Sequence, residues 1–362
     1  MTKRIYNFSA GPATLPTEVL EHAQSELLSF NGIGMSIMEI SHRSKPFDAV
    51  IESARSGLRH LLSIPENYQI LFLQGGATLQ FSMIPLNFLG KDETADYIVT
   101  GAWGKKAVKE AKREGSVAAI YNSEADGFRS VPDPAELSFT SNAKYMHYTS
   151  NETIEGVEFK TDLDAGGIPV VCDMSSNILS KPIDIEKYAM IYAGAQKNIG
   201  PSGVTLVIIR DDMLLKVPAD QHTLLDYRAI AEKDSMLNTP NTWGIYIIDL
   251  VCKWLIGRGG LSEMAKYNSE KAAVLYEAID SSDGFYSGHA DVSARSLMNV
   301  TFRLPDEELE KRFADEAAKN EFDGLKGHRS VGGIRASIYN AFPKEGVSAL
   351  VEFMKEFAAK NG

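Results

Sequence analysis

The sequence predicts an α/β protein with a large, doubly wound and mostly parallel sheet and a second, smaller α+β domain. Between residues 69 and 209, short apolar segments alternate with segments of helical periodicity, which is the order of elements in a doubly wound sheet. The apolar segments on either side of residue 197 lack regular polar alternation, as expected for strands covered on both faces. After about residue 260 long helices dominate, so we expect the second domain to begin there.

The N-terminal part is predicted to consist of loops and two helices. Glycine and proline punctuate the first fifteen residues, which we expect to form a loop. Apolar spacing predicts an amphipathic helix over residues 17–30 with Thr17 as its N-cap, and a second helix over residues 47–62. A polar loop that contains His42 and Arg43 lies between them.

Strands and helices then alternate. We expect strands over residues 69–73, 96–100, 117–121, 145–148, 169–172, 190–193 and 204–209, and helices over residues 79–89 and 105–114. Ligands of such sheets bind outside the carboxyl ends of the strands. Residues that directly follow these strands are therefore the candidates for a functional site.

The C-terminal part is expected to form the small domain. We predict helices over residues 262–279, 307–319 and 344–360, and strands over residues 297–304 and 333–338. Residues 16–260 would form the large domain, and residues 1–15 and 261–362 the small one. The sequence contains no repeat or flexible linker, so the two domains should pack tightly.

Composition and charge restrict the classes of function. The 362 residues carry a formal net charge of −11, which argues against a general nucleic-acid binder. No apolar segment opens the chain, and the apolar residues 245–256 are interrupted by Asp249 and Lys253, so we expect neither a signal peptide nor a membrane span. Cys172 and Cys252 both lie in apolar segments and indicate no disulfide or metal site. We expect a cytoplasmic protein.

One lysine stands apart from the others. Lys197 lies among small residues in the segment MIYAGAQKNIGPSG (residues 190–203), where a tight loop joins two predicted strands. A lysine removed from water loses its proton more easily and becomes a nucleophilic amine. For this segment taken alone, the alternative is a loop lysine that points to solvent.

The segment from Gly75 to Thr78 favours the binding of a single phosphate. It follows a predicted strand and opens a predicted helix, where free N–H groups and the positive end of the helix dipole attract anions. It lacks the Lys of a P-loop and the spacing of a dinucleotide fingerprint. A plain strand–helix turn is the alternative.

Two further residues follow predicted strands. Asp173 has a carboxylate that could hold a pyridinium N–H, and Trp103 has an indole that could stack on a flat ring. Taken singly, each also suits a turn or a core position. A lysine, an aspartate, an aromatic ring and a phosphate-binding turn on one doubly wound sheet together predict a pyridoxal phosphate site.

A group of basic residues points to anionic substrates. His42 and Arg43 lie in the early loop, and His328, Arg329 and Arg335 lie near the C-terminus, with glycine and serine around them and no nearby carboxylate. Guanidinium groups suit carboxylate and phosphate oxygens. Solvated surface charge is the alternative for any one of them.

Seven motifs spread over the whole chain support a more specific interpretation. They are NFSAGPATLP (7–16), MEISHRS (38–44), QGGATLQF (74–81), YTSNETIEG (148–156), YAGAQKNIGPSG (192–203), LNTPNTW (237–243) and KGHRSVGGIRASIYNA (326–341). In these motifs the chain closely resembles the phosphoserine aminotransferase family, which belongs to the class V aminotransferases and has the pyridoxal phosphate-dependent transferase fold of type I.

The resemblance implies a role for each matching cofactor residue. Lys197 would carry pyridoxal 5'-phosphate as a Schiff base, Asp173 would pair with the ring nitrogen, and Trp103 would stack on the ring. Thr153 would touch the hydroxyl side of the ring. The cofactor phosphate would be held by Ala77 and Thr78 with Gln196 beside them, and by Asn238 and Thr239 of the neighbouring subunit, which implies a homodimer with shared active sites.

The resemblance also implies the substrates. Ser9 and Arg43 match glutamate-contacting positions, while the substrate phosphate and carboxylate would be anchored by His42, His328, Arg329 and Arg335. The implied reaction is reversible amino transfer from L-glutamate to 3-phosphonooxypyruvate, which gives O-phospho-L-serine and 2-oxoglutarate in serine biosynthesis, with a related step in pyridoxine biosynthesis as a further expectation. Some family members carry an arginine where this chain has Thr78, which leaves the phosphate contacts open.

Three other functions are weighed against this one. A cysteine desulfurase would need a mobile, exposed cysteine. An alanine–glyoxylate or serine–pyruvate aminotransferase would not need the basic residues around His328. A non-catalytic protein with the same fold would not need both Lys197 and Asp173.

Overall fold

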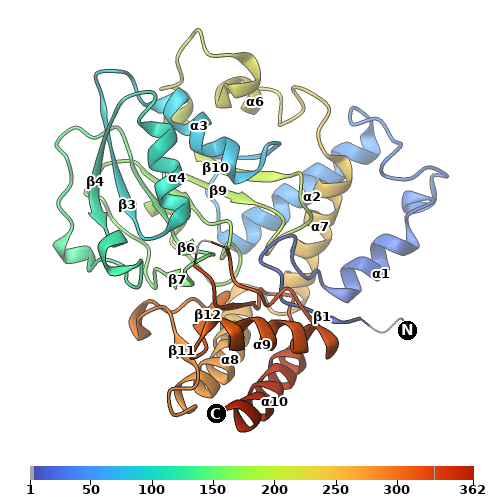
Figure 1. Ribbon diagram of the computed structural model, residues 1–362. Coiled ribbons are helices and arrows are strands. Elements are labelled where there is room, and N and C mark those ends of the chain that lie inside the picture. Colours follow the sequence, from blue (N-terminus) through green and yellow to red (C-terminus); the bar gives the residue numbers. More distant parts are fainter. Residues whose placement is uncertain (1–3, 330) are drawn as a thin grey trace.

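A seven-stranded sheet forms the centre of the larger part of the molecule (Figure 1). The computed structural model describes residues 4–329 and 331–362. The strand order is β2 (Tyr68–Leu73), β10 (Thr205–Arg210), β9 (Met190–Gly194), β8 (Val170–Asp173), β5 (Met146–Thr149), β3 (Thr94–Val99) and β4 (Ser116–Asn122). β10 runs antiparallel to both of its neighbours, and the other pairs are parallel. The predicted mostly parallel α/β sheet is confirmed.

Both faces of the central strands are buried, which explains their continuous apolar character. In β10, Leu206 and Ile208 belong to one core cluster, and Val207 and Ile209 belong to another. Successive side chains of a strand point to opposite faces, so the two clusters lie on opposite sides of the sheet. The first cluster contains side chains of α2 (Lys45–Leu62) and α7 (Thr242–Gly257), and the second those of α3 (Gly76–Phe88), α4 (Ala102–Ala111) and α6 (Tyr227–Ala231).

A second group of elements lies below the large sheet in Figure 1. It contains the antiparallel sheet β11 (Ser287–Gly288), β12 (Asn299–Arg303) and β14 (Ile334–Ser337), with the helices α8 (Gly260–Asp280), α9 (Glu307–Lys319) and α10 (Lys344–Asn361). β1 (Tyr6–Asn7) pairs with β13 (Phe322–Asp323), and Phe8 belongs to the core cluster of this part. The division into two domains remains a prediction, which these separate cores support.

The first helix differs from the prediction. α1 covers Thr17–Ser25 and stops before Phe30, which begins a separate short 3-10 turn, η1 (Phe30–Gly32). Asn31 has a φ of 47°, a left-handed conformation that an α-helix does not accommodate. The expected N-cap was also wrong, because Pro16 occupies that position and the Thr17 hydroxyl instead accepts a 2.6 Å hydrogen bond from Arg4.

Several elements were not predicted. α7 covers the apolar segment around Cys252, and a small hairpin, β6 (Asn151–Glu152) and β7 (Val157–Glu158), follows β5. The remaining short elements are α5 (Asp211–Leu214), η2 (Glu124–Asp126), η3 (Pro134–Glu136), η4 (Ile185–Lys187), η5 (Thr223–Leu225) and η6 (Val292–Ala294). Within the described ranges, no helix combines the length and the apolar character needed to cross a membrane.

Candidate active site

Lys197 lies in the loop between β9 and β10, as the sequence predicted. The N–H of Ala195 donates to the carbonyl of Val204 and closes the base of this loop. The Lys197 Nζ donates to the hydroxyl of Thr153 at 2.6 Å and to that of Ser176 at 3.0 Å. Two hydroxyl groups from different loops therefore hold the amine in one position.

The surroundings of Lys197 make its amine easier to deprotonate. Desolvation lowers its pKa to about 8, and the charge of Arg335 acts in the same direction, while the charges of Asp173 and Glu152 oppose the shift. A neutral amine is the nucleophilic form of lysine. At neutral pH a larger fraction of this amine is therefore neutral than for an exposed lysine, and this fraction can attack a carbonyl carbon.

Asp173 is the last residue of β8, and 4% of its surface is exposed. The N–H of Ser175 donates to its Oδ1 at 2.9 Å. Burial raises the pKa of the carboxyl group, against the opposing effects of the Lys197 charge and of hydrogen bonds from Ser175 and Tyr192. This buried carboxyl faces the same cavity as Lys197.

A cavity of about 270 Å³ brings the predicted cofactor residues together. Its lining includes Ala77, Thr78, Trp103, Thr153, Asp173, Gln196 and Lys197. Two of its polar atoms, the indole Nε1 of Trp103 and the hydroxyl of Thr149, are buried without a hydrogen-bond partner in the described structure. The N-terminus of α3 also borders the cavity and has no side-chain cap, so its N–H groups remain available to an anion.

This set of groups fits pyridoxal phosphate. The cofactor needs an amine for its aldehyde, an acid for its ring nitrogen, a flat partner for its ring and N–H donors for its phosphate. Lys197, Asp173, Trp103 and the start of α3 offer these groups around one cavity.

Two buried carboxyl groups hold the N-terminus of α4, the helix that carries Trp103. Glu152 accepts the N–H groups of Trp103 at 3.0 Å and Gly104 at 2.8 Å, and Glu155 accepts that of Ala102 at 3.0 Å. Burial raises the pKa of both carboxyl groups, that of Glu155 to about 7. These bonds fix the backbone from which the indole projects into the cavity.

Cationic side chains of the C-terminal segment lie close to one another. Arg335 is on β14 and is half-buried, and its Nε has no hydrogen-bond partner in the described structure. Burial lowers the pKa of His328, and three neighbouring cations lower it further, in the order Arg335, Lys106 and Arg329. Three of the predicted anion-binding residues thus form one electrostatic group.

The N-terminal loop lies against the loop of Lys197. The N–H of Ala13 donates to the carbonyl of Gln196 at 2.9 Å, and the hydroxyl of Tyr339 donates to the carbonyl of Ala10 at 2.7 Å. Ser9 therefore belongs to a segment that is fixed between the cofactor cavity and the smaller part of the molecule.

The predicted substrate residues, and two of the predicted cofactor residues, do not line this cavity. Asn238 and Thr239 are exposed, and Gln74 holds their loop through a 3.0 Å bond to the Thr239 carbonyl. His42 and Arg43 lie in the loop before α2. Within one chain, these four residues are separate from the cofactor residues that line the cavity.

Sequence reasoning missed several residues of the site. Ser175 and Ser176 line the cavity, and the signal was their position directly after Asp173 at the end of a strand. Glu152 carried no such signal, because its importance depends on hydrogen bonds to the start of α4 that the sequence does not reveal.

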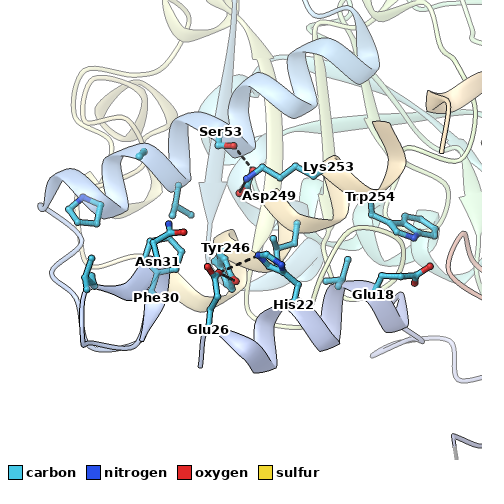
Figure 2. Close-up of a pocket in the computed structure, with 16 residues that line it drawn as sticks. Glu18, His22, Glu26, Phe30, Asn31, Ser53, Tyr246, Asp249, Lys253 and Trp254 are labelled. Carbon is cyan, nitrogen blue, oxygen red and sulfur yellow. Dashed lines mark hydrogen bonds and ion pairs between the residues drawn. The ribbon is translucent and has the colours of Figure 1, made fainter. Parts of the chain in front are cut away.

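A larger cavity lies elsewhere. It has a volume of about 840 Å³ and opens between α1, α2 and α7, with Glu26, Tyr246 and Asp249 in its wall (Figure 2). None of the predicted cofactor or substrate residues lines it. The chemistry of the lining, and not its volume, therefore identifies the site.

Comparison with known proteins agrees with this chemistry. Residues 5–350 match the family model "Aminotransferase class-V". The chain belongs to the class V aminotransferases. It is 53% identical to the phosphoserine aminotransferase of Lysinibacillus sphaericus, with both chains fully covered.

Solved structures extend this comparison. The phosphoserine aminotransferase from Bacillus circulans subsp. alkalophilus superposes with a TM-score of 0.98 at 50% identity, with both chains fully covered. The enzyme from Trichomonas vaginalis, whose structure contains pyridoxal phosphate, superposes with a TM-score of 0.92 at 42% identity over 97% of this chain and 100% of that one. The chain is a pyridoxal phosphate-dependent aminotransferase of fold type I, as predicted.

Proposed function

We propose that this aminotransferase transfers the amino group of L-glutamate to 3-phosphonooxypyruvate, giving 2-oxoglutarate and O-phospho-L-serine. The single observation that carries the choice of substrate is the basic group of His328, Arg329 and Arg335 in a chain whose net charge is −11, with Arg335 close enough for its charge to act on Lys197. Such a group suits a substrate with both a carboxylate and a phosphate. Relatives that are 50–53% identical bear the name phosphoserine aminotransferase.

Each residue of the cavity has a separate role in the proposed reaction. When bound, pyridoxal phosphate acts as an electron sink that acidifies the hydrogen on the substrate α-carbon. The Lys197 Nζ would remove this proton as a general base and deliver it to the cofactor carbon that carries the transferred amino group. Thr153 and Ser176 hold the Nζ in place before the reaction. Asp173 would accept a hydrogen bond from the ring nitrogen and keep it protonated.

The remaining assignments complete the proposal. Trp103, Ala77, Thr78 and Gln196 line the cavity, where Trp103 would stack on the ring and the other three would hold the phosphate. Arg335, His328 and Arg329 bind the substrate anions together with His42, while Ser9 and Arg43 contact glutamate. Asn238 and Thr239, which are exposed and outside their own chain's cavity, would serve the cofactor of a second subunit in a homodimer. We place the enzyme in serine biosynthesis, with the related pyridoxine step as a second use.

Absorption spectroscopy of the cofactor-loaded protein tests this function. L-Glutamate should convert the near-visible band of the bound cofactor to that of its amino form, and 3-phosphonooxypyruvate should restore it. Pyruvate at the same concentration should restore little. An equal response to pyruvate would contradict the phosphorylated substrate and favour an aminotransferase of the alanine–glyoxylate type.

Two variants test the roles of the residues. Lys197→Ala should abolish turnover, because neither covalent attachment nor proton transfer remains possible, and Asp173→Asn should lower kcat strongly with the fold intact. Lys187→Ala, which removes an exposed lysine after β8, is the control and should leave kcat unchanged. Near-normal turnover of Lys197→Ala would refute the assignment.

A further inference from the structure

Lys106 stands on α4 one turn after Trp103. Its Nζ lies 3.9 Å from the centroid of the Trp103 ring, as the spacing i, i+3 on a helix allows. The same indole borders the cofactor cavity, and the Lys197 Nζ lies 5.8 Å from its centroid. The ammonium group of Lys106 is therefore held at the wall of the active site by a cation–π contact.

The charge of Lys106 is not neutralised by an ion pair. Among residues 4–329 and 331–362, no carboxylate lies within 4 Å of its Nζ and no hydrogen bond joins it to another residue, and the side chain is exposed. The preceding residue behaves differently, because the Lys105 Nζ lies 2.5 Å from the Glu124 carboxylate. Two adjacent lysines on one helix thus have different electrostatic surroundings.

Lys106 adds its charge to the cations of the C-terminal segment. The charges of Arg335 and Lys106 both act on His328, whose pKa is lowered first by burial. Both also act on the buried Glu155. Positive charge thus converges from α4 and from the C-terminal segment, with the Glu155 carboxyl as the acidic group on which both act, and such a field favours the binding of an anion.

No cation of α3 contributes to this wall. α3, whose first residues border the cavity, contains neither Lys nor Arg, and Thr78 at its start is uncharged. Beside the indole, the larger part therefore supplies positive charge from Lys106 on α4, in addition to the Lys197 amine on the other side.

We propose that Lys106 binds the phosphate group of the substrate and helps the enzyme to prefer phosphorylated keto acids. The proposal rests on the proposed function. A phosphate dianion above the edge of Trp103 would receive one charge-assisted hydrogen bond from the Lys106 Nζ and further ones from the C-terminal cations. The exposed, unpaired ammonium can reach such a ligand without breaking an existing ion pair.

Three variants test this residue. Lys106→Met keeps the apolar stem and removes the charge, Lys106→Arg keeps the charge, and Lys105→Met is the matched control. We would measure kcat and KM with 3-phosphonooxypyruvate and with hydroxypyruvate, the same keto acid without its phosphate. Lys106→Met should raise KM for the phosphorylated substrate about five- to tenfold, the effect of one charge-assisted contact screened by water. Its KM for hydroxypyruvate should not change.

The other two variants test whether the effect depends on the charge at residue 106. Lys106→Arg should retain most of the wild-type KM, and Lys105→Met should match the wild type with both substrates. Equal losses with both substrates would overturn the proposal, because they would mean that Lys106 only supports Trp103. An unchanged KM for both would overturn it as well.

Inhibition by inorganic phosphate separates this proposal from the proposed function. If the wild type shows no preference for the phosphorylated keto acid, the proposed function fails. Weaker phosphate inhibition of Lys106→Met than of the wild type would still support a phosphate-binding role for Lys106, and equal inhibition would overturn it.

Discussion

The lowered pKa of Lys197 leads to a quantitative prediction for the cofactor-free protein. Burial brings this pKa from 10.5 to about 8. At pH 7.5 roughly a quarter of the molecules would then carry a neutral amine, against about one in a thousand for a lysine with its ordinary pKa. Only the neutral amine attacks an aldehyde. The rate at which the cofactor-free protein combines with pyridoxal phosphate should therefore rise with pH to a midpoint near 8.

Stopped-flow absorption between pH 6 and 10 measures this midpoint, with a free lysine derivative as the control whose midpoint lies above pH 10. Asp173→Asn provides the second perturbation. The negative charge of Asp173 raises the pKa of Lys197, so its removal should move the midpoint below that of the wild type. A wild-type midpoint near 10, or an upward shift in Asp173→Asn, would refute this reasoning.

Three further predictions concern packing and burial. A methyl group at Gly101 would lie 2.5 Å from the carboxyl carbon of Glu152, so Gly101→Ala should lower the free energy of unfolding in urea by about 2–4 kcal/mol through overpacking and strained hydrogen bonds. Gly257→Ala, where nothing lies within 4 Å, is the control, and equal effects would contradict the account. Phe313→Ala should cost about 3–5 kcal/mol in the same titration, because the ring is fully buried; a loss below about 1 kcal/mol would argue against this core. Burial raises the pKa of both cysteine thiols, so neither should react with a disulfide reagent at pH 8 until guanidinium unfolds the protein, and rapid labelling of the folded protein would show an exposed thiol.

Much of the cofactor site could be predicted because its residues follow strands in the sequence. Asp173 ends β8, Trp103 lies just after β3, and Lys197 lies just after β9. The carboxyl ends of parallel strands meet at one edge of a sheet, so local patterns were enough to bring these residues together. The same reasoning could not decide which hydroxyl groups hold the Lys197 amine, because Thr153 and Ser176 come from separate loops.

Other features could not be predicted for physical reasons. The segment that forms α7 is apolar around most of its circumference, interrupted by Asp249 and Lys253, and packs against α2 and the sheet, so it shows little of the periodicity by which a half-buried helix is recognised. α1 ends at Ser25 with Glu26 as its C-cap, and the chain then continues into the separate turn η1, which contains the left-handed Asn31. The dipeptide Asn31–Gly32 is a turn signal, but it lies beyond the predicted end of the helix and does not mark the end at Ser25.

The sequence by itself determined the class of fold, the cofactor and the residues at the strand ends, because each depends on local periodicity or on residues close together in the chain. The tertiary structure decided how those residues are used. It buried Lys197 enough to lower its pKa, placed Glu152 and Glu155 at the start of α4, and left Lys106 unpaired beside the indole. These properties arise from desolvation and from contacts between distant segments, and both exist only when the chain is folded.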